Sequence, residues 1–167
     1  MHRLIVIRHA KSDWPEGVPD HDRPLGERGR RDAPAAGQWL QQHDLTPDIV
    51  AVSTATRTRQ TWQLLAEQFP VEPNSFSEDR VYAASWQELL AVVQEFPEEC
   101  RTAAVVGHNP GCEELATSLA SSGSMTARTA MARKYPTCGI AVLRLAEPWA
   151  QTTSGSAELV EFHIPRG

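Results

Sequence analysis

Three short apolar runs that do not alternate with polar residues constrain the fold of this chain more than any other feature. They occupy residues 4–7, 49–52 and 103–106. A strand with one face in water alternates apolar and polar side chains, so an uninterrupted run indicates a strand that is covered on both faces, as in a parallel sheet. The three runs therefore predict buried parallel strands at the centre of the molecule.

Between the first two runs, residues 32–43 carry an apolar stripe with the period of a helix. Pro34 is compatible with this helix only in its first turn, because proline lacks the N–H that an interior position donates. We therefore expect the helix to begin near Arg31 or Asp32.

Three more helices are expected over residues 57–69, 85–96 and 110–119. Ser85 and Glu88 have the spacing of a capping box at the start of the second of these. Asn109 is expected to cap the third, with Pro110 at its first helical position.

Strands that alternate with helices predict an α/β fold with three layers, α/β/α, around a mostly parallel sheet. Residues 139–145 and 159–164 are expected to form later strands, at least one of them antiparallel or at an edge. Residues 121–136 have no pattern that predicts their structure. The length is typical of one domain, so we expect residues 1–167 to form a single domain.

Composition excludes several classes of protein. The net charge of −5 argues against a nucleic-acid surface, and no run approaches the roughly 20 apolar residues of a membrane span. Cys100, Cys112 and Cys138 are odd in number and form no CxxC pair, which favours reduced thiols in the cytoplasm over disulfides or a zinc site. The histidines show no metal-binding spacing, so we expect neither a metal nor a cofactor.

Charged and polar residues follow the ends of the three buried runs. Arg8 and His9 end the first, Ser53 ends the second with Arg57 four residues later, and His108 follows the third before a predicted helix. In an open α/β sheet the ligand lies outside the carboxyl ends of the strands. Two arginines, two histidines and a helix N-terminus gathered there predict an anion site, and a phosphoryl group matches the arginine forks.

Four blocks in order resemble the motifs of the histidine phosphatase superfamily, which has the phosphoglycerate-mutase-like fold. Residues 8–12 (Arg-His-Ala-Lys-Ser) resemble its Arg-His-Gly-Glu-Ser/Thr signature. The other three blocks are residues 24–29, 53–61 and 107–111. The set is most similar to the short bacterial SixA-type phosphohistidine phosphatases. Ala10 in place of Gly and Lys11 in place of Glu depart from the signature and speak against a phosphoglycerate mutase.

The resemblance implies roles for individual residues. His9 would be the nucleophile that forms a phosphohistidine, and Arg8, Arg57 and His108 would surround the phosphate. Flanking cations disfavour protonation of a histidine, which suits a nucleophile that must be neutral. Ser12 and Asn109 are further candidate phosphate ligands, and a turn-forming role is the alternative for Ser12.

The general acid stays open. Other members of the superfamily carry a glutamate in a Glu-Arg-x-Tyr-like stretch, and Asp79 is its possible counterpart here. Glu78 and Asp13 are alternatives, and a fourth is that no acid is needed. An alkoxide leaving group requires a proton in the transition state, whereas a protonated imidazole is already a good leaving group.

Two other phosphatase-like patterns are attributed to chance. Cys138 and Arg144 have the spacing of a cysteine-phosphatase loop, but the residues between them read as a strand, which would hold them about 20 Å apart. Asp20 and Asp22 resemble an aspartyl phosphatase motif, but no strand precedes them.

The sequence therefore predicts a phosphatase that removes phosphate from phosphohistidine, with a phosphorylated partner protein as its substrate. A phosphomonoesterase acting on small molecules at the same pocket is the alternative, and a phosphate-binding module without catalysis is a third reading. No nucleic-acid or membrane partner is expected. The sequence does not fix the oligomeric state, and a monomer is compatible with it.

Overall fold

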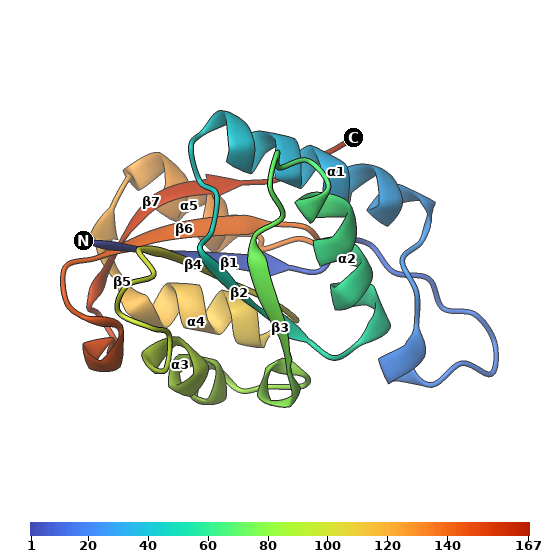
Figure 1. Ribbon diagram of the computed structural model, residues 1–167, viewed down its shortest axis with the longest axis horizontal. Coiled ribbons are helices and arrows are strands. Elements are labelled where there is room, and N and C mark those ends of the chain that lie inside the picture. Colours follow the sequence, from blue (N-terminus) through green and yellow to red (C-terminus); the bar gives the residue numbers. More distant parts are fainter.

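The computed structural model describes residues 1–167, and its seven strands form one mixed sheet with helices on both faces (Figure 1). The strands are β1 (His2–Arg8), β2 (Ile49–Ser53), β3 (Asn74–Glu78), β4 (Thr102–Gly107), β5 (Ala120–Gly123), β6 (Ile140–Leu145) and β7 (Ala157–His163). The helices are α1 (Glu27–Gln42), α2 (Thr56–Ala66), α3 (Trp86–Gln94), α4 (Gly111–Leu119) and α5 (Met125–Arg133). None of them combines the length and the apolar character that crossing a bilayer requires.

The strand order is β3-β2-β4-β1-β6-β7-β5. The three predicted apolar runs are β1, β2 and β4, and they pair in parallel at the centre of the sheet. Strand β6 runs antiparallel to both of its neighbours, β1 and β7. The α/β class, the mostly parallel sheet and the antiparallel later strand are thus confirmed.

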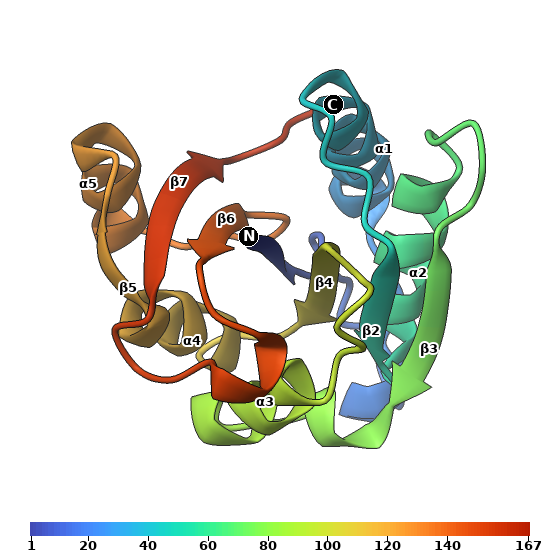
Figure 2. The ribbon, with the colours of Figure 1, turned by 60° about the vertical axis from the view of Figure 1, so that its left-hand side comes forward.

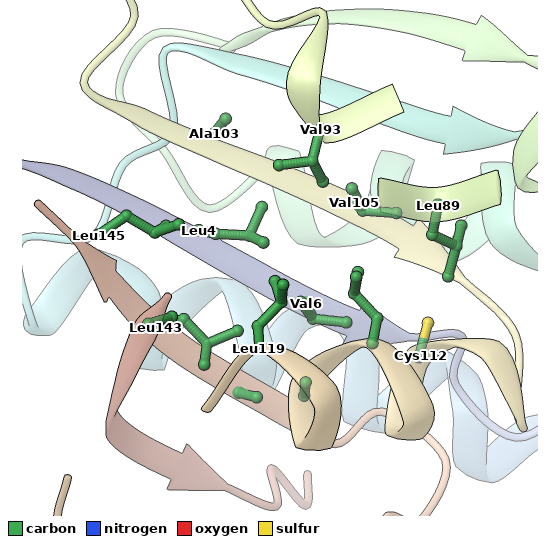
Figure 3. Packing of buried hydrophobic residues seen from close by; sticks show 14 of the residues in the cluster. Leu4, Val6, Leu89, Val93, Ala103, Val105, Cys112, Leu119, Leu143 and Leu145 are labelled. Atoms are coloured by element: carbon green, nitrogen blue, oxygen red, sulfur yellow. The ribbon is translucent and has the colours of Figure 1, made fainter. Parts of the chain in front are cut away.

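Both faces of the central strands are buried, which explains why their sequences do not alternate. In β1, Leu4 and Val6 pack with α3 and α4, whereas Ile5 and Ile7 face the side covered by α1 and α2. Figure 2 shows the two helix layers on opposite sides of the sheet. Figure 3 shows Leu4 and Val6 packed against α3 and α4 side chains. Burial on this scale is the main stabilising contribution to such a fold.

Helix α1 begins earlier than Pro34 suggested. It starts at Glu27 and carries Pro34 in its interior, so the predicted start near Arg31 or Asp32 is wrong. The proline removes only the hydrogen bond to the carbonyl of Arg30. The first turn packs closely on the preceding loop, since a Cβ on Gly29 would lie 2.1 Å from the Lys11 carbonyl oxygen. Tertiary packing therefore extends the helix past a residue that disfavours it locally.

The predicted capping box at α3 is confirmed, with Ser85 and Glu88 each bonded to the other's backbone N–H. Helix α4 begins one residue later than expected, at Gly111, with Pro110 at the N-cap position. The Asn109 side chain still accepts a hydrogen bond from the Glu113 N–H, at 3.2 Å.

Strand β3 and the pair β5 and α5 have no counterpart in the predicted elements. Strand β3 is an exposed edge strand with the mostly polar sequence Asn-Ser-Phe-Ser-Glu. Strand β5 lies at the opposite edge, and α5 follows it within the segment whose structure the sequence left open.

The register of the sheet brings several of the candidate residues together. Arg8 is paired with Gly107 in the parallel ladder of β1 and β4, and the His9 N–H donates to the Gly107 carbonyl at 2.9 Å. Val52 lies opposite Val106 on the other side of β4, so Ser53 reaches the same edge. The residues that follow these strands therefore meet at one place on the carboxyl side of the sheet.

Candidate active site

A cavity of about 230 Å³ lies at this edge and collects the residues that follow the three central strands. Its lining includes Arg8, His9, Ser12, Arg57, His108 and Asn109, together with Lys11, Trp14, Arg23 and Thr137. The first six of these ten are candidates from the sequence, whereas its acid candidates are not among the lining residues. A larger cavity of about 630 Å³ between α4 and α5 contains no histidine and a single cation, Arg128.

His9 has a defined tautomer. Its Nδ1 lies 2.7 Å from the carbonyl oxygen of Ala10, and because a carbonyl only accepts, Nδ1 carries the proton. The Nε2 atom is left with a free lone pair. Burial first, and then the neighbouring His108, Arg57 and Arg8, lower the pKa of His9 to about 3. A neutral imidazole with a fixed lone pair is what nucleophilic attack requires.

His108 is held by Ser53. The Ser53 hydroxyl is fully buried, and its oxygen lies 2.7 Å from His108 Nε2. This nitrogen is the acceptor available to the hydroxyl proton of Ser53. Donation from Ser53 to Nε2 puts the ring proton of His108 on Nδ1, an atom that is buried and has no protein partner. Burial and the charge of Arg57 lower the pKa of His108 to about 4, so it is a neutral donor at pH 7.

Three buried nitrogen atoms of the cavity residues lack protein partners: Arg8 Nε, Arg57 Nε and His108 Nδ1. Buried donors without acceptors cost free energy, on the order of 1–3 kcal/mol each, and are uncommon in native proteins. An anion with several oxygen atoms, bound among these residues, would bring acceptors to a group of side chains that has donors to spare. This arrangement is suited to a phosphoryl group next to the lone pair of His9.

Both arginines are fixed by backbone carbonyls. Arg8 donates from Nη1 to the carbonyl of Tyr135 at 3.0 Å, and Arg57 donates from Nη1 to the carbonyl of Asp20 at 2.7 Å. Arg57 also donates from Nη2 to the Asp20 carboxylate at 3.1 Å. The guanidinium groups are therefore held in place before a ligand arrives, which reduces the reorganisation that binding requires.

Ser12 and Asn109 both line the cavity but differ in their capacity to donate a hydrogen bond to a ligand. The Ser12 oxygen accepts a hydrogen bond from Arg23 Nη2, which leaves its own O–H free to donate. Ser12 also forms a β-bridge with Leu25, in keeping with the turn-forming alternative. Both amide N–H groups of Asn109 are already used, by Glu113 at 3.2 Å and by the Tyr135 carbonyl at 3.1 Å.

The acid candidates from the sequence lie outside the cavity. Asp79 is exposed in a 3-10 turn (Asp79–Val81), where Val81 is the buried residue. Glu78 is paired with Arg80 at 2.7 Å, and Asp13 lies against Gly26. Packing of Val81 into the core turns Asp79 outward, so the structure does not bring Asp79 together with His9.

Asp20 reaches the site through its contact with Arg57. Its carboxylate accepts hydrogen bonds from Tyr82 at 2.6 Å, Arg23 at 2.9 Å and Arg57 at 3.1 Å. These donors, with the Tyr82 hydroxyl the strongest, hold the pKa of Asp20 well below its usual range. Asp20 belongs to a 3-10 turn (Asp20–Asp22) rather than to the end of a strand. The absence of a preceding strand argues against an aspartyl phosphatase, but it does not exclude a role for Asp20 beside Arg57.

Trp14 lines the cavity from the loop between β1 and α1. Its ring lies over the guanidinium of Arg23, with 3.2 Å between Arg23 Cζ and the ring centroid, and the residue is 75% exposed. Trp14, Asp20 and Arg23 come from the loop between β1 and α1, which extends from the right-hand side of Figure 1. Residues 8–14 and 20–25, which contain them, share in the resemblance to SixA-type proteins, but that resemblance gives these three residues no individual role.

The two site histidines predict a specific titration behaviour. Because their pKa values are about 3 and 4, both rings stay neutral from pH 8 down to about pH 5. The unfolded chain takes up these protons near pH 6.5, so stability is expected to fall as the pH drops below that value. NMR of the ring carbons, assigned with His9→Ala and His108→Ala variants, tests this. Midpoints near 6.5 for both rings would contradict it.

No three His, Cys, Asp or Glu side chains are grouped in a way that could hold a metal ion. The expectation that the reaction needs neither metal nor cofactor stays a prediction.

Cys138 and Arg144 do not form a phosphate-binding loop. Cys138 is buried just before strand β6, whereas Arg144 lies within that strand, is exposed and pairs with Glu158.

Comparison with known proteins agrees with the geometry. An uncharacterized protein of Mycobacterium tuberculosis is 44% identical over 162 residues, covering 96% of this chain and all of the relative. The solved structure of a candidate phosphohistidine phosphatase SixA from Nakamurella multipartitia has a TM-score of 0.87 at 33% identity, covering 98% of this chain and 96% of that one. The structure of a candidate SixA from Agrobacterium tumefaciens has a TM-score of 0.81 at 28% identity, with 98% and 99% coverage.

The family model of the histidine phosphatase superfamily (branch 1) matches residues 4–104, which is more than half of the chain. That region contains the Arg8-His9 motif, the loop that carries Asp20 and the helix that carries Arg57. The chain therefore belongs to the histidine phosphatase superfamily and is a phosphatase with a histidine nucleophile.

Proposed function

We propose that this protein hydrolyses phosphohistidine on a partner protein, with His9 as the nucleophile. The observation that carries the proposal is the neutral His9 next to three buried nitrogen donors without partners, on Arg8, Arg57 and His108. His9 Nε2 attacks phosphorus, the bond to the leaving group breaks, and water then hydrolyses the phosphorylated His9. The arginines and His108 stabilise the charge on the phosphoryl oxygens in both steps.

The acid–base properties of the site favour phosphohistidine over a phosphoester. An alkoxide leaving group needs a proton, but Asp20 is an anion because its pKa lies far below neutral, and Asp79 lies outside the cavity. A phosphorylated imidazolium leaves as a neutral imidazole without any proton transfer. The likeness to proteins described as SixA phosphohistidine phosphatases supports the same substrate class.

The proposed partner and the proposed cellular compartment rest on the charge of the chain and on its cysteines. The net charge of −5 argues against a nucleic-acid partner, and a phosphorylated protein is the partner proposed. All three cysteines are free, which supports a reducing compartment such as the cytoplasm.

A substrate panel tests the proposed function. We expect kcat/KM for a peptide with phosphohistidine to exceed that for the same peptide with phosphoserine by about tenfold or more. Brief exposure to labelled substrate should give an acid-labile, base-stable label on the protein that a His9→Ala variant lacks. Faster turnover of phosphoserine or of small phosphoesters would assign the site to a phosphomonoesterase, and binding without turnover would make it a binding module.

A further inference from the structure

A second cavity adjoins the one that contains His9. Its volume is about 570 Å³, and it shares Arg57, His108 and Asn109 with the first cavity. Arg57 is only 6% exposed, and its Nε has no protein partner. A molecule whose phosphoryl group contacts Arg57 and His108 can therefore extend into the second cavity.

The charge of this second cavity is opposite to that of the first. Its ionised side chains besides Arg57 are the carboxylates Asp20 and Glu114, and Tyr82 and Ala84 contribute apolar surface. Two of the Arg57 donors are already bonded to Asp20, at 2.7 and 3.1 Å. The cavity therefore favours a group that is positively charged or donates hydrogen bonds, which is the reverse of what a phosphate requires.

Asp20 retains capacity for one more hydrogen bond. A carboxylate has about four acceptor positions, and three are filled: Arg57 and Tyr82 donate to Oδ2, and Arg23 donates to Oδ1. The remaining position is on Oδ1, which has a single donor, and the side chain as a whole is 51% exposed.

We propose that Asp20 accepts a hydrogen bond from the unphosphorylated ring nitrogen of the substrate phosphohistidine, and so selects phosphorylated imidazolium groups over phosphoesters. This inference rests on the proposed function and names the subsite that gives it specificity. Asp20 acts here as an acceptor that touches the substrate, in addition to positioning Arg57.

The reaction balances without a general acid. In the bound imidazolium, one ring nitrogen carries phosphorus and the other carries the proton that Asp20 accepts as a hydrogen bond. When His9 Nε2 forms its bond to phosphorus, the substrate P–N bond breaks and its electron pair stays on the ring nitrogen. The product is a neutral imidazole that keeps its N–H, so no proton moves.

The protein uses the same arrangement for its own histidine. After transfer, His9 carries phosphorus on Nε2 and a proton on Nδ1, and that N–H donates to the Ala10 carbonyl at 2.7 Å. An acceptor on the second ring nitrogen thus maintains the imidazolium form in the phosphorylated His9. Asp20 would do the same for the substrate, with the added stabilisation of a negative charge.

The test compares Asp20→Asn and Asp20→Ala with Asp22→Asn, a matched control in the same turn whose carboxylate lies 3.6 Å from His21. Each variant is assayed on a phosphohistidine peptide and on p-nitrophenyl phosphate, whose leaving group needs no proton. Loss of support for Arg57 lowers kcat/KM on both substrates. Loss of the imidazolium contact is expected to lower it about tenfold or more further on phosphohistidine alone.

The ratio of the two kcat/KM values separates the outcomes. A ratio that falls in both Asp20 variants and holds in Asp22→Asn supports the inference. Equal losses on the two substrates would show that Asp20 acts only through Arg57 and would overturn it. If the wild-type protein hydrolyses p-nitrophenyl phosphate but not phosphohistidine, the proposed function itself fails, and the inference fails with it.

Discussion

Replacement of His9 by alanine is expected to reduce turnover by about 10⁴-fold or more while the chain stays folded. In the proposed function His9 supplies the lone pair that attacks phosphorus, and no other side chain in the cavity offers a neutral imidazole nitrogen free of a protein partner as an acceptor. The fold is expected to remain because His9 bonds to the neighbouring strand through its backbone N–H, a group that alanine retains. Steady-state kinetics and thermal unfolding measure the two effects.

His43→Ala is the matched control for this variant. His43 is exposed at the end of α1 and stacks on Trp39, far from the strand ends in sequence and outside the cavity lining. It should keep wild-type activity. The His9→Ala protein should still bind tungstate or vanadate, since Arg8, Arg57 and His108 are unchanged. Turnover by His9→Ala near the wild-type rate would refute His9 as the nucleophile.

Replacement of Arg57 by alanine is expected to lower kcat/KM by about 10²- to 10³-fold. The change removes a buried cation whose Nε has no partner in the protein, together with both hydrogen bonds to Asp20. Arg57→Lys should recover only part of the loss, because lysine keeps the charge but cannot form the planar fork.

Arg59→Ala is the control for Arg57→Ala. Arg59 lies on the same helix, is exposed, and bonds only to Thr54 and Thr56. Its loss should change kcat/KM little. If the Arg57→Ala and Arg59→Ala proteins had the same kcat/KM, Arg57 would have no role in phosphate binding.

The centre of the molecule could be predicted because its signals are local and strong. Strands β1, β2 and β4 are continuous apolar runs, and a rule about the carboxyl ends of parallel strands was enough to bring Arg8, His9, Arg57 and His108 to one cavity. The edge strand β3 was missed since an exposed strand with polar residues has no apolar pattern to reveal it.

The rest of the site depends on the path of a loop, which sequence pattern does not determine. Asp20 meets Arg57 across a separation of 37 residues and Tyr82 across 62. Asp79 shows the converse: its place in a family-like stretch suggested a catalytic acid, but burial of Val81 decides which way the turn faces. Side-chain direction in irregular segments follows from tertiary packing.

The proposed nucleophile and the residues proposed to meet a substrate belong to different kinds of structure. His9 follows β1, which is hydrogen-bonded to a strand on each side, whereas Trp14 and Asp20 lie in an exposed connection before α1. The two kinds of structure are joined by the contact between Arg57 and Asp20. A change of sequence in the connection is therefore expected to leave the strand ends undisturbed only where that contact is retained.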